Sequence, residues 1–215
     1  GEKEFKKTVL RRLASTNSAE FLNYIKEALE NKRLIKNQMT GMLHYTLYND
    51  KPVHSYEDSF DHFIKYNESI RKEALELIDY NLKHIKWINK KIHLNYQLPL
   101  DLYGDYHLAQ ILAAIGVHKE DHKYPMRQGV FYVKDKNTDI FFITINKMEG
   151  DYLESTMYND YAISNELFHW ESQSTTSVTS ATGQRYIHDR SDDHVVLLFV
   201  REAKNKHKST MPYTF

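Results

Sequence analysis

The sequence predicts an α+β protein in which an all-helical domain precedes a domain built around β-strands. Through residues 1–93, apolar side chains recur every three to four positions, the period of an amphipathic helix. After residue 94, continuous apolar runs of four to six residues alternate with turn residues, which is typical of buried strands. We therefore expect a helical domain at 1–93 and a sheet domain at 94–215.

The first region shows signals for several helix starts and a long final helix. Ser18 and Ser55 each precede an apolar periodic segment and are expected to act as N-caps. No glycine or proline interrupts residues 53–98. The last helix is expected to carry one stripe formed by Ile70, Ala74, Leu77, Ile78, Leu82, Ile85, Ile88 and Ile92. Its lysines could contact phosphates or a partner, but a solvated helix face is the favoured interpretation.

The second region combines one helix with several strands. Asp105 is expected to cap a helix that Gly116 closes. Residues 130–133 and 140–145 predict a hairpin, and residues 195–200 predict a further strand. The apolar runs are continuous rather than alternating, so both sheet faces should be covered. A compact α+β barrel or a curved sheet fits this pattern.

Composition excludes several classes of function. The chain has 29 basic residues (lysine and arginine) and 29 acidic residues (aspartate and glutamate), so its net charge does not indicate a polyanionic partner. The chain has no cysteine, which excludes disulfides, thiolate catalysis and cysteine-based zinc sites. No apolar run approaches the roughly 20 residues of a membrane span. We expect a cytoplasmic protein without membrane contact, and its start at Gly1 without an initiator methionine suggests a piece of a longer chain.

One enzymatic pattern deserves testing. Glu202-Ala203-Lys204 follows the predicted strand at 195–200, and Asp189, Asp192 and Asp193 precede it. In many metal-dependent nucleases, carboxylates in such positions hold Mg²⁺ while a lysine orients the attacking water. A strand that runs into a charged surface turn gives the same pattern in a sequence with 27% charged residues, and this interpretation is favoured. The nuclease remains the alternative function.

A stretch rich in aromatic and acidic residues is the best binding candidate. Aromatic rings can stack on a nucleobase while carboxylates and amides bind its polar edge. The same residue types can also form a polar network inside a β-domain, and residue types alone leave both open. The candidates are Tyr158, Asp160, Tyr161, Trp170, Glu171 and Gln173.

The same stretch resembles a known family. The runs 158–164, 168–174 and 197–202 are similar to the C-terminal region of SauUSI-like Type IV restriction endonucleases, in which a phospholipase-D-type nuclease and a superfamily 2 helicase come first. Residues 129–132, 144–147 and 99–116 share the resemblance.

This resemblance implies a bacterial, cytoplasmic module of antiviral defence that reads 5-methylcytosine or 5-hydroxymethylcytosine in double-stranded DNA by base flipping. The implied fold is an SRA-like (SET- and RING-associated-like) curved sheet or barrel, with the helical domain as a coupler to the motor. The implied partners are modified duplex DNA and the helicase and nuclease domains of the same parent chain. This chain itself would not be an enzyme and would need no cofactor, because ATP and Mg²⁺ belong to the absent helicase part.

Within that resemblance, physical arguments assign roles. If residues 158–161 are extended, Tyr158 and Asp160 share one face, so Asp160 is expected to read the 4-amino edge of cytosine. Trp170 is expected to supply the second stacking ring, and Glu171 to be a structural partner. The expected contacts to the DNA backbone are Ser174, Thr175, Arg185 and Lys147.

Overall fold

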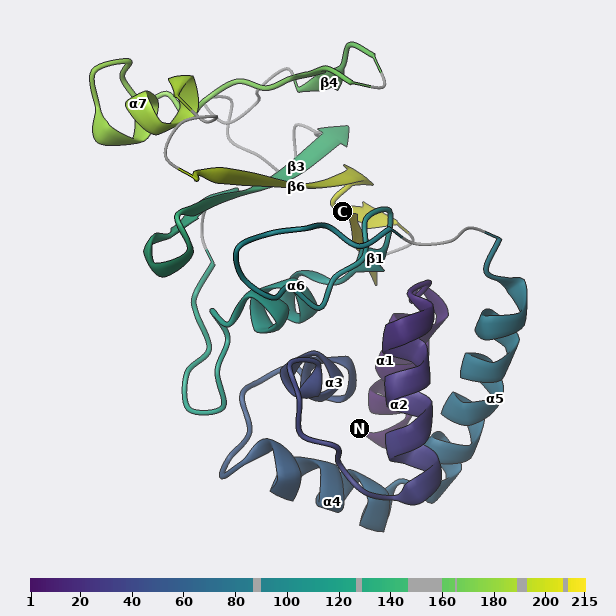
Figure 1. Ribbon diagram of the computed structural model, residues 1–215. Coiled ribbons are helices and arrows are strands. Elements are labelled where there is room, and N and C mark those ends of the chain that lie inside the picture. The colour runs from purple at the N-terminus through teal and green to yellow at the C-terminus, as the bar shows by residue number, and fades with distance from the viewer. Residues whose placement is uncertain (87–89, 127–128, 147–159, 165, 189–192, 207–208) are drawn as a thin grey trace. The chain divides into compact units, whose positions relative to one another are not determined.

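The computed structural model describes residues 1–215 except 87–89, 127–128, 147–159, 165, 189–192 and 207–208 (Figure 1). The chain forms two compact units, and we describe each by itself. Unit 1 comprises Gly1–Pro125 with Thr214–Phe215, and unit 2 comprises Met126–Tyr213. The division predicted at residues 93 and 94 stays a prediction, because compactness alone does not define an evolutionary domain.

Unit 1 is mainly helical, as the sequence predicts. Its elements are α1 (Glu2–Ala14), α2 (Ala19–Asn31), α3 (Thr40–Leu47), α4 (Tyr56–Tyr66), α5 (Glu68–His84), β1 (Asp105–Tyr106) and α6 (Leu108–Ile115). The two predicted caps are confirmed: the Ser18 hydroxyl accepts the Phe21 N–H, and the Ser55 hydroxyl accepts the Asp58 N–H. Each such cap stabilises its helix by about 1 kcal/mol.

The core of unit 1 gathers the apolar stripes of these helices. Val9 and Leu13 of α1, Ile25 of α2 and Ile78 of α5 are all fully buried. Each buried side chain of this size contributes roughly 1.5–3 kcal/mol relative to exposure. The predicted long stripe is wrong at its end, because α5 stops at His84 and Ile85 is already extended.

The early end of α5 has one local and one tertiary cause. The predicted stripe continued through β-branched isoleucines, which lose side-chain freedom in a helix. The segment beyond His84 also has an alternative partner, since Lys90 forms an isolated antiparallel bridge with Leu102. The Leu102 N–H donates to the Lys90 carbonyl over 2.8 Å. Tertiary pairing therefore replaces helix in this segment.

Helix α6 begins two residues later than predicted. Asp105 lies in β1, and the N-cap is His107. The His107 side chain accepts the Gln110 backbone N–H, and the Gln110 Oε1 accepts the His107 backbone N–H. Gly116 ends the helix with φ of 86°, a left-handed conformation that favours glycine. The predicted helix and its C-terminal signal are thus confirmed, and the predicted cap is corrected.

The sheet region contains the predicted hairpin. Strands β2 (Val130–Val133) and β3 (Thr138–Asn146) pair antiparallel through a 3₁₀ turn, η1 (Lys134–Lys136). Strand β6 (Val195–Ala203) pairs parallel to β3, with Asp139 beside Val196 and Phe141 beside Leu198. The remaining elements are β4 (Tyr161–Ala162), β5 (Phe168–His169), α7 (Ala181–Ile187), β7 (Asn205–Lys206), β8 (Ser209–Thr210) and β9 (Tyr213–Thr214).

The main sheet is mixed, with strand order β1-β9-β6-β3-β2. The predicted α+β class is confirmed. The two ends of this strand order, β1 and β2, are not paired with each other, so the sheet is open and the predicted closed barrel is not formed. The SRA-like assignment stays a prediction. Continuous apolar runs showed that strands were buried, but they carried no information on closure.

None of the helices in the described part of the chain is long and apolar enough to cross a bilayer.

Candidate nucleic-acid interface

The candidate site of unit 2 is built on one face of β3. Asp139 and Phe141 are two residues apart on this strand, so their side chains lie on the same face. Tyr132 of β2 is directly opposite Asp139 in the register and shares that face. Strands β2 and β3 together therefore present a carboxylate and two aromatic rings on this face of the sheet.

Asp139 is the centre of a buried ionic network. Its carboxylate is fully buried and accepts two bonds from Arg185, from Nε at 3.0 Å and from an Nη at 3.3 Å. The His194 Nε2 lies 2.9 Å from the same carboxylate. The Arg185 guanidinium also lies 3.8 Å from the centre of the Tyr132 ring. Asp139 raises the pKa of Arg185, which keeps the guanidinium charged.

This network gives Arg185 a structural task that sequence reasoning missed. Helix α7 carries Arg185, so the ion pair fastens α7 to β3. The Arg185 side chain is 24% exposed. A guanidinium held by a buried carboxylate on one side and a ring on the other has few directions left for a phosphate. The predicted phosphate contact of Arg185 stays a prediction.

Three aromatic rings form a wall beside this network. Trp170 stacks on Phe141 with centroids 4.2 Å apart and an interplanar angle of 22°. Tyr186 meets both rings edge-on, at 5.3 Å from Phe141 and 5.2 Å from Trp170. Burial raises the pKa of Tyr186 to about 12, so its hydroxyl stays protonated. Trp170 is only half-buried, so this ring belongs to the core and also reaches the surface.

The structure brings Asp160 and the Trp170–Glu171 segment together. Asp160 is 7% exposed, and its Oδ1 accepts the Glu171 backbone N–H over 3.1 Å. The carboxylate expected to read a base is thus held by a backbone bond of the kind expected for Glu171. The Glu171 side chain is half-buried. The division of labour between these two carboxylates stays a prediction.

A short hairpin connects these two segments. Strands β4 and β5 pair Tyr161 with His169 and Ala162 with Phe168. The rings of Tyr161 and His169 are nearly parallel, at 6° and 4.7 Å. Tyr161 is 50% exposed, so this stacked pair is accessible.

The remaining predicted contacts divide into three groups. Ser174 and Thr175 are exposed, whereas Gln173 is half-buried and its carbonyl accepts the Thr176 N–H over 2.8 Å. Tyr158 and Lys147 lie outside the described residues. The described candidates thus come from one continuous stretch, 160–187, between β3 and β6.

The nuclease pattern is spread along β6. Glu202 is exposed near the end of this strand, Lys204 follows the strand, and Asp193 precedes its first residue. Eight residues lie between Asp193 and Glu202, and the seven from Val195 to Arg201 are extended strand, which alone spans roughly 20 Å, so these two carboxylates cannot share one metal ion. Asp189 and Asp192 lie outside the described residues. Within the described residues, no group of three or more histidine, aspartate or glutamate side chains is arranged to hold a metal.

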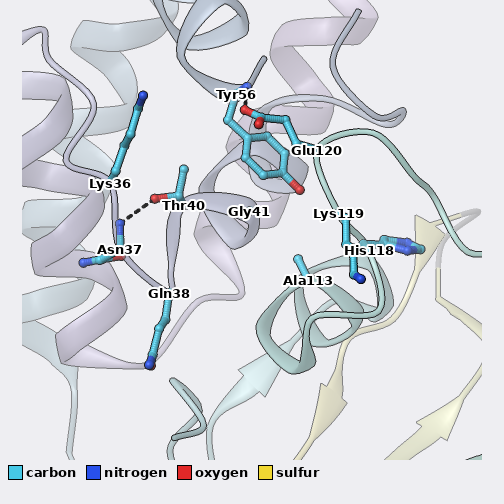
Figure 2. A pocket seen from close by; sticks show the side chains of 10 residues that line it. All are labelled: Lys36, Asn37, Gln38, Thr40, Gly41, Tyr56, Ala113, His118, Lys119 and Glu120. Carbon is cyan, nitrogen blue, oxygen red and sulfur yellow. Dashed lines mark hydrogen bonds between the residues drawn. The ribbon is translucent and has the colours of Figure 1, made fainter. Parts of the chain in front are cut away.

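Unit 1 has pockets that the sequence did not indicate. One of them has a volume of about 340 Å³. Figure 2 shows its lining, with the Tyr56 side chain pointing toward Gly41 and with Lys119 and Ala113 opposite. Burial raises the pKa of Tyr56. Two acidic side chains at this pocket are already engaged within the protein. Glu57 forms an ion pair with Lys36 at 2.6 Å, and the Glu120 carboxylate accepts the Tyr56 N–H over 2.6 Å. Because the lining comes from three separate segments, no sequence motif marks this pocket.

A second pocket, of about 450 Å³, lies along the 48–62 segment of unit 1. His44 lines it and is 4% exposed, with Nε2 at 2.7 Å from the Asp50 carbonyl. Burial lowers the pKa of His44, so the ring is neutral near pH 7. The pocket is lined by acidic, basic and apolar side chains together, so its lining does not indicate a class of ligand.

The comparisons with known proteins give one family. A family model described as "Domain of unknown function (DUF3427)" matches residues 100–215, more than half of the chain. No curated protein and no solved structure matches the chain.

Proposed function

We propose that this chain, which belongs to the DUF3427 family, is a DNA-binding module that reads 5-methylcytosine or 5-hydroxymethylcytosine in duplex DNA by base flipping. In this proposal it serves an ATP-dependent Type IV restriction endonuclease, whose helicase and nuclease parts act in the same parent chain. The module itself performs no chemistry and takes no cofactor. The proposal is motivated by the resemblance of residues 158–164, 168–174 and 197–202 to the C-terminal region of SauUSI-like Type IV restriction endonucleases.

One observation carries the proposal: Asp160 is fixed beside the segment of Trp170. The Glu171 N–H holds the Asp160 carboxylate, and Trp170 is the preceding residue. A carboxylate and an indole ring from two segments thus lie at the same end of one hairpin. A flipped base needs such a pair, because it offers a π-face and a polar edge at right angles to each other.

The energies of the aromatic wall suit this task. Stacking on an aromatic ring contributes about 1–3 kcal/mol per base. Extruding a base from the duplex costs a few kcal/mol. Trp170 is held in place by Phe141 and Tyr186, so little side-chain entropy is lost when a base stacks on it. One fixed ring with one further contact therefore offsets most of the cost of flipping.

A carboxylate at the base edge would select cytosine. The 4-amino group of cytosine is a donor, whereas the O4 of thymine is an acceptor and would repel Asp160. Each well-placed edge contact discriminates by about 1–3 kcal/mol. The 5-methyl group adds only about 0.8 kcal/mol when buried, so contact alone discriminates modestly between modified and plain cytosine.

The loop that follows Trp170 suits the DNA backbone. Ser174 and Thr175 are exposed and have short hydroxyls, which can donate to phosphate oxygens without bulk. Arg185 is engaged with Asp139, so these hydroxyls would add phosphate contacts that do not depend on its guanidinium. In the parent enzyme, further cationic contacts would come from the motor.

The test is binding of the full chain to matched duplexes with cytosine, 5-methylcytosine or 5-hydroxymethylcytosine, with and without Mg²⁺. We expect tighter binding to the modified duplexes and no cleavage. Equal affinity for all three across salt concentrations contradicts the proposal. Cleavage by the purified chain with Mg²⁺ supports the nuclease alternative instead.

Asp160→Asn sharpens this test, because an asparagine Oδ1 can still accept the Glu171 N–H while the negative charge is lost. We expect the modified duplex to bind about tenfold more weakly, at unchanged melting temperature, because the acceptor for the 4-amino group is lost. The matched control is Glu166→Gln, which removes an exposed carboxylate elsewhere on the hairpin. If Glu171→Gln weakens this binding and Asp160→Asn does not, the two carboxylates have exchanged roles.

A further inference from the structure

Arg201 is a half-buried cation near the end of β6, and no carboxylate pairs with it among the residues that the structure describes. Its Nε donates to the Thr144 hydroxyl over 2.9 Å, and Thr144 is its neighbour in the register of β3 with β6. Its guanidinium also lies 4.4 Å from the centre of the Tyr213 ring. Neither contact neutralises the charge, because the hydroxyl and the ring are both uncharged.

Arg185 of the same unit shows how a fully engaged guanidinium differs. Its Nε and one Nη both donate to the buried Asp139 carboxylate. In Arg201 only Nε is bonded, and neither terminal Nη group makes a hydrogen bond within the described part of the chain. A charge that is partly removed from water without a counter-ion costs free energy. The surroundings of Arg201 therefore indicate that an anion reaches it from another molecule.

The Arg201 guanidinium is held in one orientation before any anion arrives. Thr144 and Tyr213 are both buried, so neither can move away from it freely. The Tyr213 ring packs edge-on against Phe142, with centroids 5.1 Å apart. A planar guanidinium fixed in this way presents its Nη groups as a fork, which matches two oxygens of one phosphate or carboxylate.

Arg201 lies close to the edge of the sheet at which β3 and β6 both end. The two strands are parallel, and Thr144 and Arg201 each stand two residues before the end of their strand. In open sheets with parallel strands, ligands commonly bind outside the carboxyl ends of those strands. The crossover that contains Asp160 and Trp170 also leaves β3 from this edge. The position thus places Arg201 at the edge from which the proposed base-binding segment departs.

The segment that follows β6 is basic. Residues 203–211 contain three lysines and no aspartate or glutamate. Lys204 is half-buried and comes directly after β6, and Lys206 is exposed in β7. Glu202 is exposed, but it is the neighbour of Arg201 in a strand, so its side chain points to the other face. Several cations in one short segment favour a polyanion over a single carboxylate.

We propose that Arg201 binds a phosphate of the DNA backbone through its two Nη groups. This inference rests on the proposed function, and it adds a contact that is independent of the modified base. Thr144 and Phe141 are three positions apart on β3, so they lie on opposite faces, and Arg201 is separate from the aromatic wall. A phosphate contact of this kind adds affinity for any duplex and no preference for a modified one.

The test compares the full chain with two variants of Arg201. Arg201→Met removes the charge and keeps an unbranched side chain over the Tyr213 ring, whereas Arg201→Lys keeps the charge and loses the fork. The control is Lys134→Met, which removes an exposed cation of unit 2 from η1, beside the start of β3. Binding to matched duplexes with cytosine or 5-methylcytosine is measured between about 50 and 200 mM salt.

We expect Arg201→Met to weaken binding to both duplexes equally, by about tenfold, because a charge-assisted contact is lost. The slope of log K against log salt concentration should become shallower by about one. Arg201→Lys should keep the slope and lose part of the affinity, and Lys134→Met should match the wild type. The melting temperature of Arg201→Met without DNA should stay close to that of the wild type, because no buried carboxylate loses its partner.

The outcomes separate this inference from the proposed function. A loss confined to the methylated duplex overturns the inference, because it places Arg201 at the base. Unchanged affinity and slope in Arg201→Met also overturn it and assign the guanidinium to a carboxylate of a protein partner. If the wild type binds both duplexes equally and Arg201→Met still lowers the slope, the reading of modified cytosine fails and the phosphate contact stands. A wild type that binds neither duplex at about 50 mM salt overturns both.

Discussion

Two histidines of unit 1 and one aspartate of unit 2 are ionisable groups that the fold holds in different ways. In unit 1, burial suppresses charge: it lowers the pKa of His107 and of His118 to about 4, so both rings are neutral near pH 7. In unit 2, pairing preserves charge, because the fully buried Asp139 is matched by Arg185 and approached by His194. The difference teaches that unit 1 should be sensitive to acid and unit 2 to the loss of a partner.

The largest expected effect is acid destabilisation of unit 1. The folded pKa of His107 and His118 lies below the ordinary value of 6.5, so the unfolded chain takes up both protons first. Stability from these residues is therefore complete above pH 6.5 and is lost as the pH falls toward about 4. We expect a loss of about 3 kcal/mol for each histidine across this window.

Urea unfolding between pH 7 and pH 4, followed by hydrogen exchange in peptides from α1 and α6, measures this effect. The variant His107→Gln should flatten the dependence by one proton, because glutamine can still accept a bond but does not titrate. An unchanged pH dependence in this variant would contradict the assignment of His107.

The second prediction concerns the partner in unit 2. Arg185→Met leaves the Asp139 carboxylate buried without its guanidinium, and we expect unfolding free energy to fall by about 3–5 kcal/mol. Denaturation followed by Trp170 fluorescence in a Trp87→Phe background measures it. The double variant Asp139→Asn with Arg185→Met should recover part of the loss, because no unpaired charge remains. If Arg185→Met weakens DNA binding at unchanged stability, the phosphate contact predicted from sequence is the better description.

The third prediction compares glycines in the two units. A Cβ at Gly183 of α7 would lie 2.1 Å from the Ser177 carbonyl oxygen, so the backbone must move. At Gly41 of α3 a Cβ would meet the Tyr56 hydroxyl and the Ala113 Cβ, both at 3.2 Å. We expect Gly183→Ala to cost about 1–3 kcal/mol and Gly41→Ala clearly less, by thermal unfolding. The reverse order would show that the 173–180 loop adapts more easily than the α3–α6 contact.

The smallest prediction compares two helix caps. Ser18 caps α2 and also donates to the buried Asp101 carboxylate over 2.6 Å, whereas Ser180 caps α7 with its hydroxyl 3.0 Å from the Gly183 nitrogen. Each change to alanine should cost about 1 kcal/mol through the cap. Ser18→Ala should cost more, because it also removes a bond from a buried carboxylate. Equal melting temperatures for the two variants would contradict this ranking.

Local signals in the sequence predicted most elements and little of their assembly. Ser18, Ser55 and Gly116 act within one helical turn, so their neighbours in sequence are sufficient to identify them. The parallel pairing of β3 with β6 and the open sheet depend on distant partners, and no local pattern encodes them. The end of α5 was missed for the same reason, since the bridge from Lys90 to Leu102 decides it.

The candidate site shows the same limit. Trp170 and Asp160 were predicted from residue type, and the structure places them on the two neighbouring arms at the open end of one hairpin. The role of Arg185 was missed because Asp139 is 46 residues away and looks like any hairpin residue in the sequence. A single acidic residue in the apolar run 138–145 was the one available signal. An isolated charge in a buried strand needs a partner, and Arg185 supplies it.

The parallel pairing of β3 and β6 has a consequence for how specificity can change. Adjacent parallel strands cannot be joined by a tight turn and need a long crossover. In this chain the crossover is 147–194, and it contains every described residue proposed to contact the modified base. Trp170 and Arg185 of this crossover pack on Phe141 and Asp139 of β3, so these two positions are tied to the sheet. Exposed crossover residues such as Ser174 and Thr175 can change without disturbing the pairing of β3 with β6. Under the proposed function, family members with a different target are expected to differ first at such exposed positions.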